Sequence, residues 1–169
     1  PAAVTTLTNC VLDGNAASEA GGAIGLLNGG LQLDHCVLSN NTAFGGDGGA
    51  ISNESGDVLA MNCTFYGNGA DVGAVYAIIG QGPEATFVNS IMWGNSPATV
   101  PDDPLMTYGW CLLENTLPLV QANDLGGNIN GDPMFYDAML GDFSVTYPSP
   151  VIDAGDPGSP YDPDNTVVD

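Results

Sequence analysis

Short apolar runs recur along the chain, separated by glycine, asparagine and proline. Many of these runs place a small residue at one position and a large apolar residue two positions later, which is the side-chain period of a β-strand. The 24 glycines and 12 prolines supply frequent turns, and no long stretch follows the 3.6-residue period of a helix. The pattern predicts an all-β protein built from short strands.

The runs repeat at a nearly fixed spacing. Aligned on Cys10, Cys36, Cys63 and Ser90, they are separated by steps of 26, 27 and 27 residues. The aligned columns are a polar position one residue back (Asn9, His35, Asn62, Asn89), a large apolar position two residues on (Leu12, Leu38, Phe65, Met92) and an asparagine five residues on (Asn15, Asn41, Asn68, Asn95). A second series, Gly22, Gly49 and Gly73, is followed each time by alanine and a β-branched apolar residue. Such periodicity indicates one structural unit stacked on copies of itself.

A unit of this size cannot bury its apolar face alone, but copies stacked about 4.8 Å apart bury a continuous core. Like residues then lie over like residues. We expect the asparagine column Asn15, Asn41, Asn68 and Asn95 to form a ladder whose amides bond to each other and to the corner backbone. Cys10, Cys36 and Cys63 are expected to line up as small inward residues.

With these repeats the chain resembles a right-handed parallel β-helix of the pectate-lyase-like superfamily. Its "GGAI", "CVLSNN" and "CTFYGN" elements are similar to repeats of the polymorphic outer-membrane proteins of bacteria. Its "NGDPMFYDAMLGDF" and "SPVIDAGDP" segments are similar to the closing segment of many large secreted bacterial β-helix proteins. The expected fold is a single-stranded solenoid of about five to six coils.

The regularity is confined to the first part of the chain. We expect regular coils of 26–27 residues over residues 1–100 and, in the same domain, irregular final coils with an Asp-rich closing segment over residues 101–169. The step from Ser90 to Cys111 is only 21 residues, so "PDDPLMT" is interpreted as a shortened coil or an edge loop.

The chain has no lysine or arginine against 20 acidic residues, a formal charge of −20. Nucleic acids and anionic lipids are bound chiefly through lysine and arginine, so neither is an expected partner. No apolar run is long enough to span a membrane, so membrane insertion is not expected either.

Aspartate is concentrated late in the chain, with 11 of 16 in residues 101–169. Loops that alternate Asp and Asn suit hard cations such as Ca²⁺, although neither stretch completes a calcium-loop pattern. The candidate calcium ligands are Asp124, Asn128, Asn130, Asp132, Asp153, Asp156, Asp162 and Asp164. The alternative is that these side chains serve turns and face water.

Three other groups of residues invite a functional interpretation. Stacked coils bring cysteines within disulfide range, but parallel side-chain vectors disfavour the bond, so free buried thiols are expected. His35 stands in the polar column of Asn9, Asn62 and Asn89 and is interpreted as a hydrogen-bonded ladder residue rather than a catalytic base. Tyr66, Trp93 and Trp110 are candidates for stacking on sugar rings; the alternative is that they cover the outer strand face.

Because the superfamily includes enzymes that degrade polysaccharides, an enzymatic function has to be considered. Lyases that the chain resembles use basic residues, which are absent here, and the aspartates of the regular coils share no column from which a hydrolase cluster can be assembled. We therefore expect a non-enzymatic, secreted or surface-displayed bacterial element with a structural, adhesive or self-assembling role. A carbohydrate-binding or polysaccharide-degrading module is the alternative. The first coil is expected to be covered by a longer parent chain or by another copy of the protein.

Overall fold

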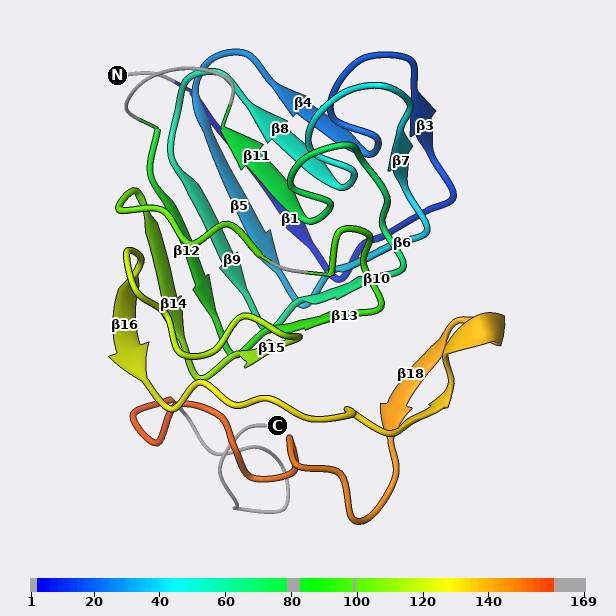
Figure 1. The fold of residues 1–169 in the computed structure, drawn as a ribbon, viewed down its shortest axis with the longest axis vertical. Coiled ribbons are helices and arrows are strands. Elements are labelled where there is room, and N and C mark those ends of the chain that lie inside the picture. Colours follow the sequence, from blue (N-terminus) through cyan, green and yellow to red (C-terminus); the bar gives the residue numbers. More distant parts are fainter. Residues whose placement is uncertain (1–2, 79–82, 99, 160–169) are drawn as a thin grey trace.

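The fold is a parallel β-helix, seen in a computed structural model that describes residues 3–78, 83–98 and 100–159 (Figure 1). The first sheet holds β1 (Val4–Thr8), β5 (Gly30–Asp34), β9 (Val58–Met61), β12 (Ala85–Val88), β14 (Met106–Gly109) and β16 (Asn123–Gly126). The second holds β2 (Val11–Asp13), β6 (Val37–Ser39), β10 (Thr64–Tyr66), β13 (Ile91–Trp93) and β15 (Leu112–Leu113). The third holds β4 (Ile24–Leu26), β8 (Ile51–Asn53) and β11 (Tyr76–Ile78). The all-β prediction and the parallel β-helix are confirmed.

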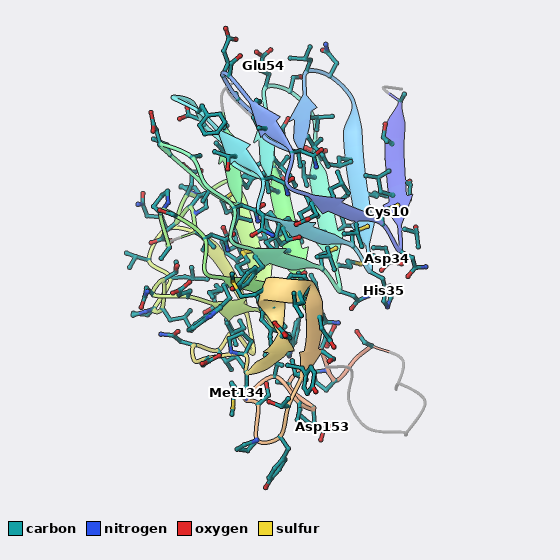
Figure 2. All side chains as sticks on the ribbon, turned by 90° about the vertical axis from the view of Figure 1, so that its right-hand side faces the viewer. Cys10, Asp34, His35, Glu54, Met134 and Asp153 are labelled. Atoms are coloured by element: carbon teal, nitrogen blue, oxygen red, sulfur yellow. The ribbon has the colours of Figure 1, made fainter. Side chains whose placement is uncertain are left out.

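Two smaller sheets complete the described strands. β3 (Ala16–Ala17) pairs in parallel with β7 (Thr42–Ala43). β17 (Phe135–Asp137) and β18 (Asp142–Val145) form an antiparallel hairpin through the 3₁₀ turn η1 (Ala138–Leu140). This hairpin lies outside the coils, against the outer face of the second sheet (Figures 1 and 2).

Neighbouring coils are aligned in the structure as the repeat in the sequence predicts. Leu12 pairs with Leu38, and Phe65 lies between Leu38 and Met92, so the apolar column runs straight across the second sheet. Ile51 likewise lies between Ile24 and Tyr76 in the third sheet. The stacking of like columns follows because every coil turns its corners at the same positions.

The predicted number of coils is wrong. Within residues 3–78, 83–98 and 100–159, three coils have a strand in all three sheets, so the solenoid has about three complete turns rather than five to six. The reason is local: after Gly94 the chain has no "GGAI" segment, and it passes through a loop to β14 without building a fourth strand in the third sheet. The first and second sheets continue, and the coils become shorter.

The corner between the first and second sheets uses a left-handed backbone conformation. The residue at this corner has a φ between 49° and 54° in five successive coils: Asn9, His35, Asn62, Asn89 and Trp110. Asparagine tolerates this region better than most residues, which explains the polar column found in the sequence. Trp110 is an unusual occupant of such a position.

The core is filled by the inward columns and by stacked aromatic rings. The ring of Phe87 lies 5.7 Å from Phe65, 5.9 Å from Tyr76 and 5.6 Å from Tyr108, measured between centroids. All four side chains are fully buried, so each offers a large apolar area to the coil above and below. This cluster joins the first sheet to the third in the middle of the solenoid.

Candidate functional site

The asparagine column forms a continuous internal ladder. Asn68 accepts hydrogen bonds at Oδ1 from the backbone N (3.1 Å) and Nδ2 (3.0 Å) of Asn41. Its own N and Nδ2 donate to Oδ1 of Asn95 at 2.9 and 3.0 Å, and Nδ2 also donates to the carbonyl of Leu38 at 2.9 Å. Asn15 donates to Asn41 in the same way. The ladder satisfies buried backbone at each corner, so its geometry is that of a structural element.

At its first residue, Asn15, the ladder has an acceptor that is not used within the described residues. At the first coil the N and Nδ2 of Asn15 are used, but within the described residues no donor reaches its Oδ1. In each of the next three coils, at Asn41, Asn68 and Asn95, that oxygen accepts two bonds from the preceding asparagine. Asn15 therefore presents the acceptor that the next coil in the series would use.

The first coil leaves the apolar interior open. Its inward residues Leu7, Leu12 and Ile24 are only partly buried, whereas their equivalents Leu33, Leu38 and Ile51 in the next coil are fully buried. Among the strands that the structure describes, β1 pairs with β5 alone. The carbonyl of Ala3 accepts from the backbone N of Gly30, so the backbone groups of Thr6 point away from β5. The result is an unpaired parallel edge above an apolar surface.

The opposite end of the core is covered by two loops. Leu117 and Leu119 pack against the core, and Val100 beside them is buried. The carboxylate of Asp102 holds the second loop, since it accepts hydrogen bonds from the backbone N–H groups of three consecutive residues, Val120, Gln121 and Ala122. These bonds lower the pKa of Asp102 below its ordinary value, the bond from Ala122 having the largest effect.

A second polar ladder follows the outer corner. Asp34 accepts hydrogen bonds from Nδ2 of Asn62 (3.1 Å) and pairs with Nδ1 of His35 (2.8 Å), and Asn89 donates to Asn62 at 3.2 Å. The backbone N of Asp156 then donates to Oδ1 of Asn89 at 2.8 Å. The chain around residues 151–159 is thereby tied across the corner, over a cavity of about 130 Å³. Asp34 and His35 lie together at this corner (Figure 2), and the ring of His35 is bonded to the adjacent Asp34.

All four cysteines are free. Cys36, Cys63 and Cys111 are buried, and Cys10 in the first coil is half-buried. Burial raises the pKa of Cys63 and of Cys111 to about 12. Thiols in this state are poor nucleophiles and poor metal ligands.

The three candidate aromatic residues do not form an open row. The ring of Tyr66 packs between Phe135 and Phe143 of the hairpin, with centroids 5.9 and 5.3 Å away. Trp110 is covered by Gly127, where even a Cβ would lie 2.2 Å from the indole ring. Trp93 lies beside Tyr66 in the register and is half-buried. The sequence did not indicate the hairpin contact, because residues 135–145 belong to no repeat.

The late aspartates serve turns in the described part of the chain. Asp124 accepts at Oδ1 from the backbone N of Gly126 and from Nδ2 of Asn128, Asp132 accepts from Met134, and Asp156 accepts from Gly158. Asn128 is also used, since its Oδ1 accepts from the backbone N of Cys111 at 2.9 Å.

The remaining calcium candidates are placed as follows. Asn130 lies two residues after Asn128. Asp153 has a left-handed backbone conformation, with a φ of 57°. Asp162 and Asp164 lie outside the described residues. In residues 3–78, 83–98 and 100–159 no three His, Cys, Asp or Glu side chains gather as metal ligands. Calcium binding through Asp and Asn stays a prediction.

Comparison with known proteins gives one family match. Residues 35–54 match the Chlamydia polymorphic membrane protein repeat. This segment spans the corner at His35, strand β6, the ladder residue Asn41 and strand β8. No curated protein and no solved structure matches the chain. Within the described residues no helix has the length and hydropathy of a membrane span.

Proposed function

We propose that this chain, a β-helix repeat protein of the polymorphic membrane protein type, is a non-enzymatic structural segment of a bacterial surface protein, displayed outside the cell. The repeat match points to a bacterial surface or outer membrane. The observation that carries the structural role is the open first coil: it presents Asn15, the β1 edge and a half-buried apolar layer in the arrangement on which each later coil is stacked.

A further β-helix coil is the partner that fits this end best. It would donate to Oδ1 of Asn15, pair with the free edge of β1 and cover Leu7 and Leu12, each by a contact already made between the existing coils. Such a coil can come from a longer polypeptide or from another copy stacked end to end. Both sources give the chain the same role, which is to extend a rigid surface rod or stalk.

Two observations weigh against the alternatives of a sugar-binding or polysaccharide-degrading module. The face of Tyr66 is taken up by the hairpin rather than offered to a ligand. Among the described residues, the carboxyl groups with shifted pKa values are Asp13, Asp102 and Asp142, and hydrogen bonds lower the pKa of each. A general acid needs a shift in the opposite direction.

The test compares self-association of the wild-type chain with that of an edge variant, Thr6→Pro. The substitution removes an N–H that points outward from β1, while the bonds to β5 are kept, so it should leave the fold intact and prevent stacking. Thr6→Val is the matched control because it keeps the N–H.

Sedimentation velocity and electron microscopy at increasing concentration report the result. We expect concentration-dependent rods for wild type and Thr6→Val, and monomers for Thr6→Pro. Wild-type monomers that bind a synthetic coil of the same repeat, residues 30–56, would assign the end to a longer polypeptide. Wild-type monomers that bind no such coil, together with cleavage of or binding to a polysaccharide panel, would overturn the structural role.

A further inference from the structure

Asparagine is followed directly by glycine at three positions, Asn28, Asn68 and Asn130. Because glycine has no Cβ, its backbone N is unshielded and can approach the side-chain carbonyl of the preceding residue. Attack by this N on the asparagine carbonyl closes a succinimide ring. In a folded chain the reaction depends on how firmly the two reacting groups are held, and the structure holds the three pairs in different ways.

The pair in the middle of the ladder is locked. Oδ1 of Asn68 accepts two hydrogen bonds from Asn41, and Nδ2 of Asn68 donates two more. The backbone N of Gly69, which would have to attack, donates to the carbonyl of Asn41 at 2.8 Å. Asn68 is also 0% exposed. Ring closure here would break several bonds in a buried site, so Asn68 is protected.

The pair at Asn28 and Gly29 is free to react. It forms the turn between β4 and β5, which leads from the first coil into the second. The side chain of Asn28 is exposed, and within the described residues neither this side chain nor the backbone N of Gly29 has a hydrogen-bond partner. A groove of about 640 Å³ runs along the turn, so water reaches both reacting groups.

The backbone of this turn is packed tightly against both neighbouring coils. Gly29 has a φ of 89°, and a Cβ on it would lie 2.4 Å from the carbonyl oxygen of Ala3. On the other side, a Cβ on Gly56 would lie 1.4 Å from the carbonyl oxygen of Gly29. The backbone N of Gly30 donates to the carbonyl of Ala3 at 2.9 Å and so ties β5 to the first coil. A longer backbone in this turn would have to move away from these neighbours.

We propose that Asn28 is a site of self-modification that loosens the first coil from the rest of the solenoid. The N of Gly29 loses its proton and forms a bond to Cγ of Asn28, while the Cγ–Nδ2 bond breaks and ammonia leaves. Water then opens the ring. Opening at the side-chain carbonyl gives aspartate, and opening at the backbone carbonyl gives isoaspartate, whose main chain is one atom longer. The longer turn draws Gly30 away from Ala3, and this does not depend on stacking at the open end.

The first experiment incubates the full chain at pH 8 and 37 °C and follows the three pairs by mass spectrometry of chymotryptic peptides. Asn28 should convert to aspartate and isoaspartate, and faster at higher pH, because the attacking N must lose its proton. Asn68 should stay intact until the chain is unfolded in urea. Asn130 is exposed and should convert as well, which makes it the internal control for a modification far from the first coil.

The second experiment measures hydrogen exchange at Gly30 before and after this incubation. In chains with isoaspartate at position 28 the Gly30 amide should exchange about five- to ten-fold faster, as expected for the loss of one backbone hydrogen bond. Asn28→Gln, which would have to close a less favourable ring, should keep its protection. Freshly prepared Asn28→Asp is the matched control for the added charge and should keep it too.

Three outcomes would each overturn the proposal. The first is an Asn28 amide that persists as long as the Asn68 amide in the folded chain. The second is unchanged Gly30 exchange in chains that carry the isoaspartate. The third is equally fast Gly30 exchange in fresh Asn28→Asp, which would assign the effect to charge rather than to the longer backbone.

Discussion

The two ends of the β-helix are built from the same columns but are finished in different ways. At the first coil, Leu12 and Cys10 are only partly buried and β1 has a free edge. At the far end, Leu113 and Cys111 occupy the same two columns and are fully buried. There the irregular segment at Asn128 and Ile129 continues the stack, since Ile129 exchanges backbone hydrogen bonds with Cys111 and Leu113. The repeat determines where a side chain points, and the loops outside the repeat determine whether it meets solvent.

One solenoid thus has an end at which the apolar core is open and an end at which it is closed. The closing loops are irregular and held by a few specific bonds, such as those of Asp102 to three backbone N–H groups. Among the described strands β16 is still an edge of the first sheet, so what is closed at this end is the apolar core rather than the sheet edge. Four predictions compare the two ends.

Thiol chemistry should distinguish the ends most strongly. With a pKa of about 12 and full burial, Cys111 should react with iodoacetamide at pH 8 at least about 100-fold more slowly than a free thiol of ordinary pKa. Cys10, half-buried in the open coil, should be the first of the four cysteines to be modified. Peptide mass spectrometry of a labelling time course measures this, with the unfolded chain as control. Equal rates for Cys10 and Cys111 in the folded chain would contradict the comparison.

Removing a ladder residue should cost far more in the middle than at the open end. Asn68→Ala removes the acceptor of the backbone N and Nδ2 of Asn41, one of the two donors to Oδ1 of Asn95 and the side-chain donor to the Leu38 carbonyl, all in a buried site. It should lower the free energy of unfolding by about 3–4 kcal/mol. Asn15→Ala removes bonds at an exposed end and should lower it by about 1 kcal/mol or less. Urea unfolding followed by circular dichroism gives both values. Similar losses for the two variants would mean that the first coil is as well ordered as the interior.

Truncation of the apolar column should show the same asymmetry on a smaller scale. Leu113→Ala opens a cavity in a closed core and should cost about 3 kcal/mol. Leu12→Ala removes a side chain that already meets solvent and should cost about 1 kcal/mol. The same urea experiment applies, and a larger loss for Leu12→Ala would show that another molecule covers the first coil in solution.

The smallest effect is expected at the clamp of the closed end. The folded-state pKa of Asp102 lies below the ordinary 3.8, so the stability it contributes is present above about pH 4 and is lost as the pH falls through the folded value. Because this carboxylate is partly exposed, Asp102→Asn should cost only about 1 kcal/mol at pH 7. The amides of residues 120–122 should be less protected from hydrogen exchange in the variant than in the wild type. In the wild type this protection should fall below pH 4, and in the variant it should not. Unchanged exchange in the variant would rule out the clamp.

The sequence alone predicted the features that recur in every coil. The Asn68 column, the inward cysteines and the register of the second sheet follow from spacing, because each coil imposes the same geometry on the next. The corner at Trp110 was also within reach, since it stands one residue before Cys111 as Asn62 stands before Cys63.

What the sequence could not give are contacts without a period. Tyr66 meets Phe135 across a long stretch of chain, and nothing near either residue marks the pairing. The coil count failed for a related reason: the first two sheets continue past Gly94, and only the third sheet loses its strand. The bonds of Asp102 to the 120–122 backbone likewise depend on how two irregular loops meet.

The interchangeable bonds of the ladder also bear on how such a chain can change over time. Asn41 meets Asn68 through the same atoms with which Asn68 meets Asn95, so removal of the 27 residues from Cys36 to Asn62 would bring equivalent partners into contact again. Duplication of that segment would do the same. A gene of this kind can gain or lose whole units by recombination between its own repeats while each product still folds, so the number of coils becomes a heritable variable.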